Sequence, residues 1–138
     1  EKFLTSKVVK TAVAIKLGKA KELKIGNLDV ARDWGHSKDY TKSMILMLEQ
    51  EFPTDFVISS MKSHTVKYLI QYVFSCLDLD YEKYVTQDES LIRKIDQKIV
   101  CGDSSKARNI LKWNTHYTFE SMIDEMVAFW MKELNKYG

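Results

Sequence analysis

The sequence predicts a helix-rich α/β domain with short strands. Apolar residues recur at helical spacing over much of the chain, which indicates several amphipathic helices. The strand-like runs between them are short and do not alternate regularly with helices, as they would in a complete doubly wound sheet. With 138 residues, of which 45% are apolar, the chain is long enough for a core of its own. We therefore expect one domain over residues 1–138.

The first half of the chain predicts two helices and two strands. The first helix should end at Gly18, a suitable C-terminal cap, with an apolar face formed by Leu4, Val8, Ala12 and Ile15. An extended segment is expected over 22–26, followed by a turn over 27–29. A second helix should run over 36–50, with these side chains facing inward: Tyr40, Met44, Met47 and Leu48. A short buried strand is predicted at 56–58.

The third predicted helix has the clearest pattern in the chain. Its apolar face consists of Val66, Leu69, Ile70, Val73, Phe74 and Leu77. Either Ser63 or Thr65 can cap its start. Residues 81–86 are expected to be extended, and a polar stretch without clear pattern follows as far as Asp96.

The C-terminal part predicts a strand and two further helices. The strand is expected at 99–101 and should end at Gly102. Asp103 or Ser104 then caps a short helix that carries Ala107, Ile110 and Leu111. The last helix should start at Thr118, with an inner face of Phe119, Met122, Ile123, Met126, Val127 and Trp130.

Composition and charge exclude several classes of protein. The net charge of +2 gives no electrostatic reason to expect nucleic acid as a partner. No apolar run approaches the roughly 20 residues of a membrane span, so no membrane association is expected. Cys76 and Cys101 lie far apart and indicate neither a disulfide framework nor a zinc site, so we expect a cytoplasmic protein. The chain starts at Glu1 and helical spacing begins almost at once, which we interpret as a piece of a longer protein.

The sequence does not contain the usual catalytic motifs. Its five glycines are not spaced as a dinucleotide fingerprint or a phosphate loop, and no Tyr is followed four residues later by Lys. The three histidines are widely separated and none has metal-ligand spacing with a cysteine. We therefore expect no catalytic residue, no cofactor site and no metal within these 138 residues.

The densest polar cluster covers residues 31–40 and has two interpretations. On composition alone the favoured one is a loop and helix start in which Arg32 pairs with Asp33 and Trp34 packs on the core. In the other, Arg32 is a fork-shaped donor for a phosphate, and Trp34 holds the loop in place.

Residues 26–40 read Gly-Asn-Leu-Asp-Val-Ala-Arg-Asp-Trp-Gly-His-Ser-Lys-Asp-Tyr. This segment resembles a long and specific motif of the GDP-mannose 4,6-dehydratases, which are extended short-chain dehydrogenase/reductase enzymes. The resemblance continues through segments 55–58, 64–66, 82–85, 102–107, 111–113 and 119–126. It covers essentially the whole chain, but only the C-terminal part of the family's chain.

The resemblance implies a specific division of labour. In the family, an N-terminal Rossmann domain holds NADP and the catalytic residues, and the C-terminal part closes over GDP-mannose. The enzyme oxidises the sugar at C4, eliminates water across C5 and C6, and returns the hydride to C6, giving GDP-4-keto-6-deoxy-mannose. The resemblance therefore implies that this chain is the substrate-binding domain of an NADP-dependent, homo-oligomeric lyase, and that it is inactive alone.

Four site residues carry over from the family by position. Lys7, in Thr5-Ser6-Lys7, is expected to contact the substrate, and Arg32 to face it. Arg93 is expected near the diphosphate and Asp96 near the ribose, so Arg32 and Arg93 should lie on one face. Arginine can donate two parallel hydrogen bonds to a phosphate, and a carboxylate accepts from ribose hydroxyls.

Some positions depart from the family pattern. The family's Arg next to Lys7 is Ser6, and its Pro after the second Arg is Lys94. Its Ala-Thr-Gly is Ser59-Ser60-Met61, and Asn114-Thr115 replaces a Pro near Trp113. The alternatives are a related sugar-nucleotide dehydratase or epimerase, a non-catalytic sugar-nucleotide-binding domain, or a helical interaction module. Without the family's upstream domain, apolar surface should be exposed near the first helix and residues 56–58, favouring self-association.

Overall fold

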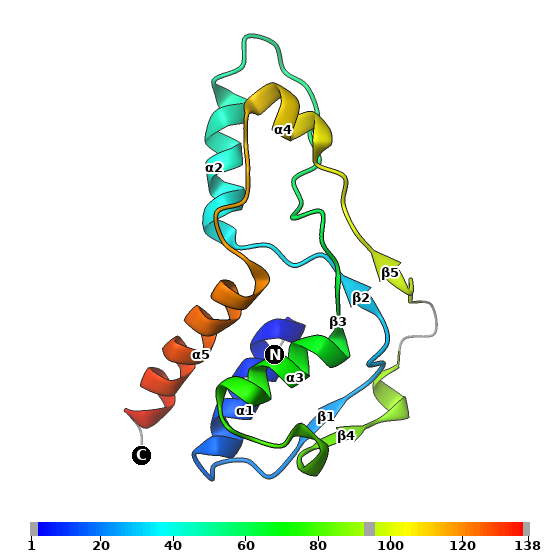
Figure 1. Ribbon diagram of the computed structural model, residues 1–138, viewed down its shortest axis with the longest axis vertical. Coiled ribbons are helices and arrows are strands. Elements are labelled where there is room, and N and C mark those ends of the chain that lie inside the picture. The colour runs from blue at the N-terminus through cyan, green and yellow to red at the C-terminus, as the bar shows by residue number, and fades with distance from the viewer. Residues whose placement is uncertain (1–2, 93–95, 137–138) are drawn as a thin grey trace.

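The computed structural model describes residues 3–92 and 96–136, and Figure 1 shows two groups of helices in it. One group contains α1 (Leu4–Lys16), α3 (Val66–Cys76) and α5 (Phe119–Asn135), which pack on one another. The other group, at the far end of the molecule, contains α2 (Ser37–Leu48) and α4 (Ser105–Leu111).

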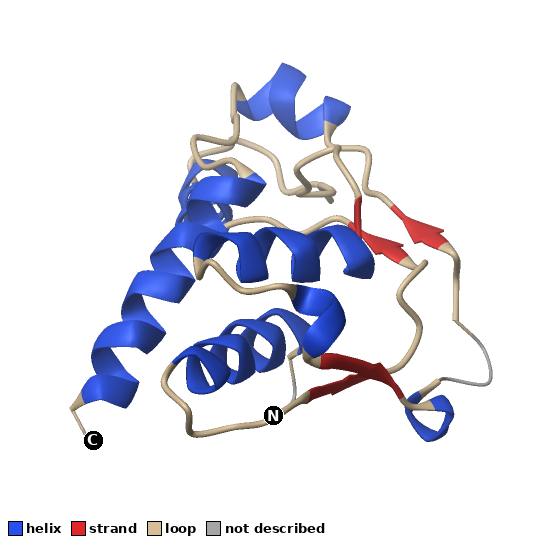
Figure 2. Ribbon diagram, turned by 60° about the horizontal axis from the view of Figure 1, so that its bottom comes forward, coloured by secondary structure: helices blue, strands red, loops and turns tan. Residues whose placement is uncertain are grey.

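The strands are two or three residues long and form two small sheets (Figure 2). In one sheet, β1 (Leu23–Ile25) runs parallel to β4 (Val85–Gln87). In the other, β2 lies between an antiparallel and a parallel neighbour, the three strands being β3 (His64–Thr65), β2 (Ala31–Arg32) and β5 (Ile99–Val100). Single turns of 3-10 helix flank β4, at η1 (Tyr81–Lys83) and η2 (Glu89–Leu91). The predicted helix-rich α/β fold with short strands is confirmed.

The main core lies between α1, α3 and α5. Its fully buried side chains come mostly from the predicted faces of the first and third helices: Val8, Val9, Ala12, Val13, Leu69, Ile70, Val73 and Phe74. Thr65 caps α3, since its Oγ1 accepts a hydrogen bond from the Tyr68 amide at 3.0 Å. The chain leaves α1 at Gly18, whose φ of +69° is the left-handed conformation that glycine tolerates.

The last helix, α5, begins at a capping box. The Thr118 side chain accepts from the Ser121 amide at 3.1 Å, and Ser121 Oγ accepts from the Thr118 amide at 3.0 Å. Its first turns are buried and its later apolar residues only partly so. No helix within the described ranges is both long and apolar enough to cross a membrane.

A second, smaller cluster surrounds the buried Trp113, together with Ala107 and Leu111 of α4. The Trp113 indole Nε1 donates to the Asp39 carbonyl oxygen at 2.8 Å. The buried Asp39 carboxylate in turn accepts from the amides of His116 and Tyr117, at 2.9 and 3.1 Å. The start of α2 is thereby fixed to the segment that leads into α5.

The predicted strand at 56–58 is wrong. Within the described residues these positions take no part in either sheet. Phe56 and Ile58 are half-buried against the Trp113 cluster, and Val57 points outward. The segment keeps the alternation of a strand, but no described strand lies beside it to complete a ladder.

Two side chains predicted to face inward are exposed: Met44 and Leu48. In α2 the fully buried positions are Asp39 and Ser43, with Leu46 and Met47 partly buried against the Trp113 cluster. The hydrogen bonds of Asp39 fix the rotation of the helix, which turns the Met44 side outward.

The expected extended segment at 81–86 begins with a turn of 3-10 helix, and the strand starts only at Val85.

The two candidate caps of α3 can be separated by mutation. Thr65→Ala should lower the free energy of unfolding by about 1 kcal/mol, because the Tyr68 amide loses its side-chain acceptor. Ser63→Ala, two residues earlier, is the matched control and should change it by less than about 0.5 kcal/mol. Urea denaturation followed by circular dichroism measures both values, and equal effects would contradict the assignment of Thr65 as the cap.

Candidate functional site

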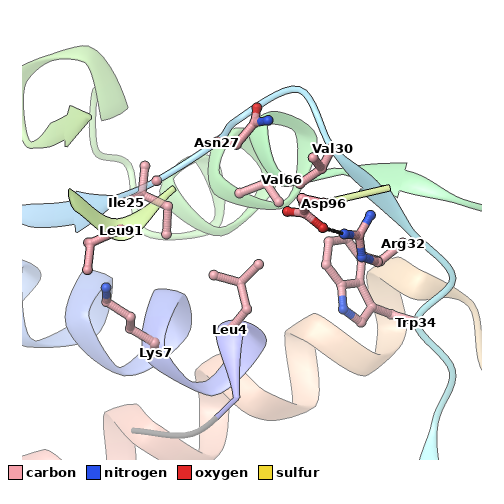
Figure 3. Close-up of a pocket in the computed structure, with 11 residues that line it drawn as sticks. Leu4, Lys7, Ile25, Asn27, Val30, Arg32, Trp34, Val66, Leu91 and Asp96 are labelled. Atoms are coloured by element: carbon pink, nitrogen blue, oxygen red, sulfur yellow. Dashed lines mark hydrogen bonds and ion pairs between the residues drawn. The ribbon is translucent and has the colours of Figure 1, made fainter. Parts of the chain in front are cut away.

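A pocket of about 320 Å³ opens between α1, the end of β1, β2 and the two residues Leu91 and Asp96 (Figure 3). Three of the four residues predicted from the sequence line it: Lys7, Arg32 and Asp96. The remaining wall is largely apolar and consists of Leu4, Ile25, Gly26, Asn27, Val30, Trp34, Val66 and Leu91. Arg93 lies outside the described residues.

The Arg32 side chain is held at the pocket wall by several acceptors. Its Nη1 donates to the carbonyl oxygens of Ala31 and Gln97, at 2.7 and 2.9 Å. Its Nη2 forms an ion pair with the Asp96 carboxylate, drawn as a dashed line in Figure 3. Both side chains of this pair are mostly buried, at 25% and 18% exposure. The guanidinium is therefore oriented before any ligand arrives.

The pairing of Arg32 with Asp33, which composition alone favours, does not occur. The Asp33 carboxylate instead accepts from the amide and hydroxyl of Ser60, at 3.0 and 2.6 Å. It also accepts from the amides of Met61 and Gly102, at 3.1 and 3.3 Å. These bonds connect the end of β2 to two segments that are distant in the sequence. Of the neighbouring residues Arg32 and Asp33, only Arg32 lines the pocket.

Gly102 is required where it stands beside this network. A Cβ built on Gly102 would lie 2.5 Å from the Cβ of Ser59 and 2.8 Å from its Oγ. The segments 59–61 and 101–103 can therefore approach Asp33 together only if residue 102 has no side chain.

Lys7 reaches the pocket from a different element. It projects from α1, and its Nζ donates to the Lys24 carbonyl oxygen of β1 at 2.7 Å. In Figure 3 the Lys7 and Arg32 side chains approach the pocket from different sides. The site thus combines two separated cations, one carboxylate and an apolar wall, an arrangement suited to an anionic ligand with a flat apolar portion.

Trp34 lies in the pocket wall, and His36 caps the helix that follows it. Trp34 lines the pocket and packs on Phe119 of α5, with ring centroids 5.8 Å apart. His36 caps α2, because its Nδ1 accepts from the Lys38 amide at 3.0 Å, and its Nε2 lies 3.2 Å from a carboxylate oxygen of Glu125. The hydrogen bond from His36 lowers the pKa of Glu125. His36 therefore acts as the N-terminal cap of α2.

The partner of Asp96 among the described residues is Arg32. Sequence reasoning missed the apolar wall, in particular Leu91, and also Asn27. The glycine at position 26 is the sequence feature that points to Leu91. A Cβ on residue 26 would lie 2.8 Å from the Leu91 carbonyl oxygen, so the close approach of Leu91 requires glycine there. In residues 3–92 and 96–136, no group of three or more His, Cys, Asp or Glu side chains is placed to hold a metal ion.

Comparison with known proteins identifies the family. The family model described as GDP-mannose 4,6 dehydratase matches residues 1–126. The chain belongs to this family. It is 37% identical over 127 residues to GDP-mannose 4,6 dehydratase 2 of Arabidopsis thaliana, covering 92% of this chain and 34% of that protein. It therefore spans about a third of the length of this relative, and it corresponds to the C-terminal part of the dehydratases.

Solved structures show the same fold at lower identity. The NADPH complex of RMD from Pseudomonas aeruginosa matches with a TM-score of 0.85 and 18% identity, covering 95% of this chain and 43% of that one. UDP-glucose 4-epimerase from Thermotoga maritima, solved with UDP-glucose, matches with a TM-score of 0.76 and 22% identity, covering 92% and 40%. The fold of this chain is thus shared with the matching part of UDP-glucose 4-epimerase.

Arg32 should also hold the pocket wall together. We expect Arg32→Ala to speed amide hydrogen exchange over 97–101, because the side chain no longer bridges Asp96 and the Gln97 carbonyl to β2. Exchange in α3 should stay unchanged. Lys42→Ala, an exposed cation on α2, is the control and should alter neither region. Hydrogen exchange measured by mass spectrometry tests this, and unchanged exchange over 97–101 would show that the bridge contributes nothing.

Proposed function

We propose that this chain is the sugar-nucleotide-binding part of a GDP-mannose 4,6-dehydratase and that GDP-mannose binds in the pocket described above. One observation carries the proposal. Lys7, Arg32 and Asp96 lie far apart in the sequence, yet they line one pocket in a chain of this family. We further propose that the domain is the whole of residues 1–138.

The pocket offers chemistry suited to each portion of such a ligand. A diphosphate favours dispersed cations, and the planar guanidinium of Arg32 can donate two parallel hydrogen bonds to it. Lys7 adds a point charge, and Arg93 is proposed to add a second guanidinium. Asp96 is a suitable acceptor for ribose hydroxyls. The apolar wall with Leu4 and Leu91 offers a surface for the flat base.

Ligand binding has to rearrange the ion pair at the wall. The Arg32 guanidinium already donates to the Asp96 carboxylate and to two carbonyl oxygens. A phosphate must therefore share the guanidinium with these acceptors or replace them. When Arg32 turns to the phosphate, the Asp96 carboxylate becomes available to the ribose. One exchange of partners would thus prepare both residues for the ligand.

The nicotinamide cofactor does not fit the residues of this chain. The chain has no dinucleotide fingerprint and no Tyr-Lys pair at a spacing of four, and its described strands are at most three residues long. We propose that NADP is bound by the remainder of a homo-oligomeric, cytoplasmic enzyme. That enzyme would convert GDP-mannose to GDP-4-keto-6-deoxy-mannose and water, and this chain would contribute substrate binding.

A second candidate follows from the shared fold. UDP-glucose 4-epimerase has the same architecture over this region, so a related sugar-nucleotide enzyme, or a binding domain without catalysis, is the alternative. Preference between GDP-mannose and UDP-glucose distinguishes the two substrate classes.

The proposal predicts binding that depends on Arg32. Isothermal titration calorimetry of the 138-residue chain should detect GDP-mannose binding stronger than that of UDP-glucose. Arg32→Ala should weaken it by roughly tenfold or more, because a charge-assisted hydrogen bond is lost. Arg32→Lys should recover only part of this, and Lys42→Ala, away from the pocket, should bind normally. GDP-mannose binding unaffected by Arg32→Ala would contradict the proposed site.

Because we propose that NADP binds outside this chain, we predict that the chain alone is inactive. Incubation of the purified 138-residue chain with GDP-mannose and NADP should give no GDP-4-keto-6-deoxy-mannose, because no residues in it are suited to hydride transfer. Product would be followed by chromatography, with a full-length dehydratase as the positive control. Turnover by a chain of verified mass would show that the chain has a catalytic site of its own.

A further inference from the structure

Helix α2 exposes an unusual amount of apolar surface. Leu48 is 87% exposed, Ile45 59% and Met44 59%, and Phe52, just beyond the helix end, is 73% exposed. Isolated exposed apolar residues are normal, but several on one helix indicate an interaction surface.

The exposed residues form a regular seam. Thr41, Ile45 and Leu48 are separated by four and three residues, the spacing by which helices pair side by side, and Phe52 follows in the loop beyond the helix end. Thr41 and Ile45 lie one turn apart on the exposed face, and Met44 extends the seam on one flank. The inner face of the same helix is already occupied by the Trp113 cluster.

The charges beside the seam are self-complementary. Lys42 and Glu49 are both exposed and lie on the same flank, seven residues apart. When two such helices pair antiparallel about a two-fold axis, this flank meets its own copy in reverse order. Lys42 of each copy then faces Glu49 of the other, so opposite charges meet twice.

We propose that α2 is a dimerisation surface, on which a second copy of this chain packs its own α2 antiparallel through Ile45 and Leu48. The reversed charge pattern is the reason to choose a second copy over an unrelated partner, since a two-fold pairing satisfies Lys42 and Glu49 of both copies at once. The proposal does not depend on GDP-mannose binding, because none of these residues lines the pocket.

Sedimentation equilibrium of the 138-residue chain tests this directly. The chain should associate reversibly to twice its own mass. Ile45→Asp should raise the dimer dissociation constant by more than about tenfold, because a charge enters the centre of the seam. Ile110→Asp is the matched control: this isoleucine is 49% exposed on α4, outside the seam, and its substitution should leave the dimer intact.

A charge swap distinguishes self-pairing from other contacts. Lys42→Glu and Glu49→Lys should each weaken the dimer by roughly threefold to tenfold, because like charges meet twice. The double variant should restore the original dissociation constant, since opposite charges face each other again. A monomeric wild-type chain, a dimer that survives Ile45→Asp, or a double variant as weak as the single ones would overturn the proposal. Circular dichroism of each variant confirms that the fold is kept.

Discussion

The rest of the structure depends on the way one carboxylate is satisfied. Asp33 accepts hydrogen bonds from Ser60, Met61 and Gly102, and thereby joins three segments that are distant in the sequence. Asp33 is half-buried, and a carboxylate that is withdrawn from water without partners is costly, so these hydrogen bonds hold the segments around it. The network fixes the end of β2 against residues 60–61 and Gly102. The position of Arg32 in the pocket follows from it.

The site is an example of a short motif that supplies both support and chemistry. Along 32–39, Arg32 faces the pocket, Asp33 holds the strand end, His36 caps α2, and Asp39 binds the segment before α5. Each of these polar side chains has a different partner, so each of the four positions needs its own residue type. Asn27, Leu91 and Lys7 then complete the pocket from elements that the motif positions only indirectly.

Much of the fold could be predicted from the sequence because the main core is built from helices with strong periodicity. The face of α3 and its cap at Thr65 follow from local spacing and hydrogen bonding. Residues 56–58 could not be predicted in this way, since a strand needs a neighbour that spacing does not reveal. Met44 and Leu48 were misplaced because the buried Asp39 sets the rotation of α2. In the site, Lys7, Arg32 and Asp96 came from family resemblance, whereas the ion pair of Arg32 with Asp96 depends on tertiary contacts.

The buried Asp39 also explains why the two ends of α2 have different surroundings. At its start, polar bonds to the His116 and Tyr117 amides and to the Trp113 indole keep the helix against the second cluster. Toward its end, the same rotation exposes Ile45 and Leu48 to solvent. Full burial of each side chain by a partner would contribute a free energy on the order of 1.5–3 kcal/mol. One buried carboxylate thus holds the start of α2 on the Trp113 cluster and leaves Ile45 and Leu48 on the outer face of α2, a helix that lies at the far end of the molecule from α1 (Figure 1). Because the pocket is built by α1, β1 and β2, the seam can acquire a partner without closing the pocket.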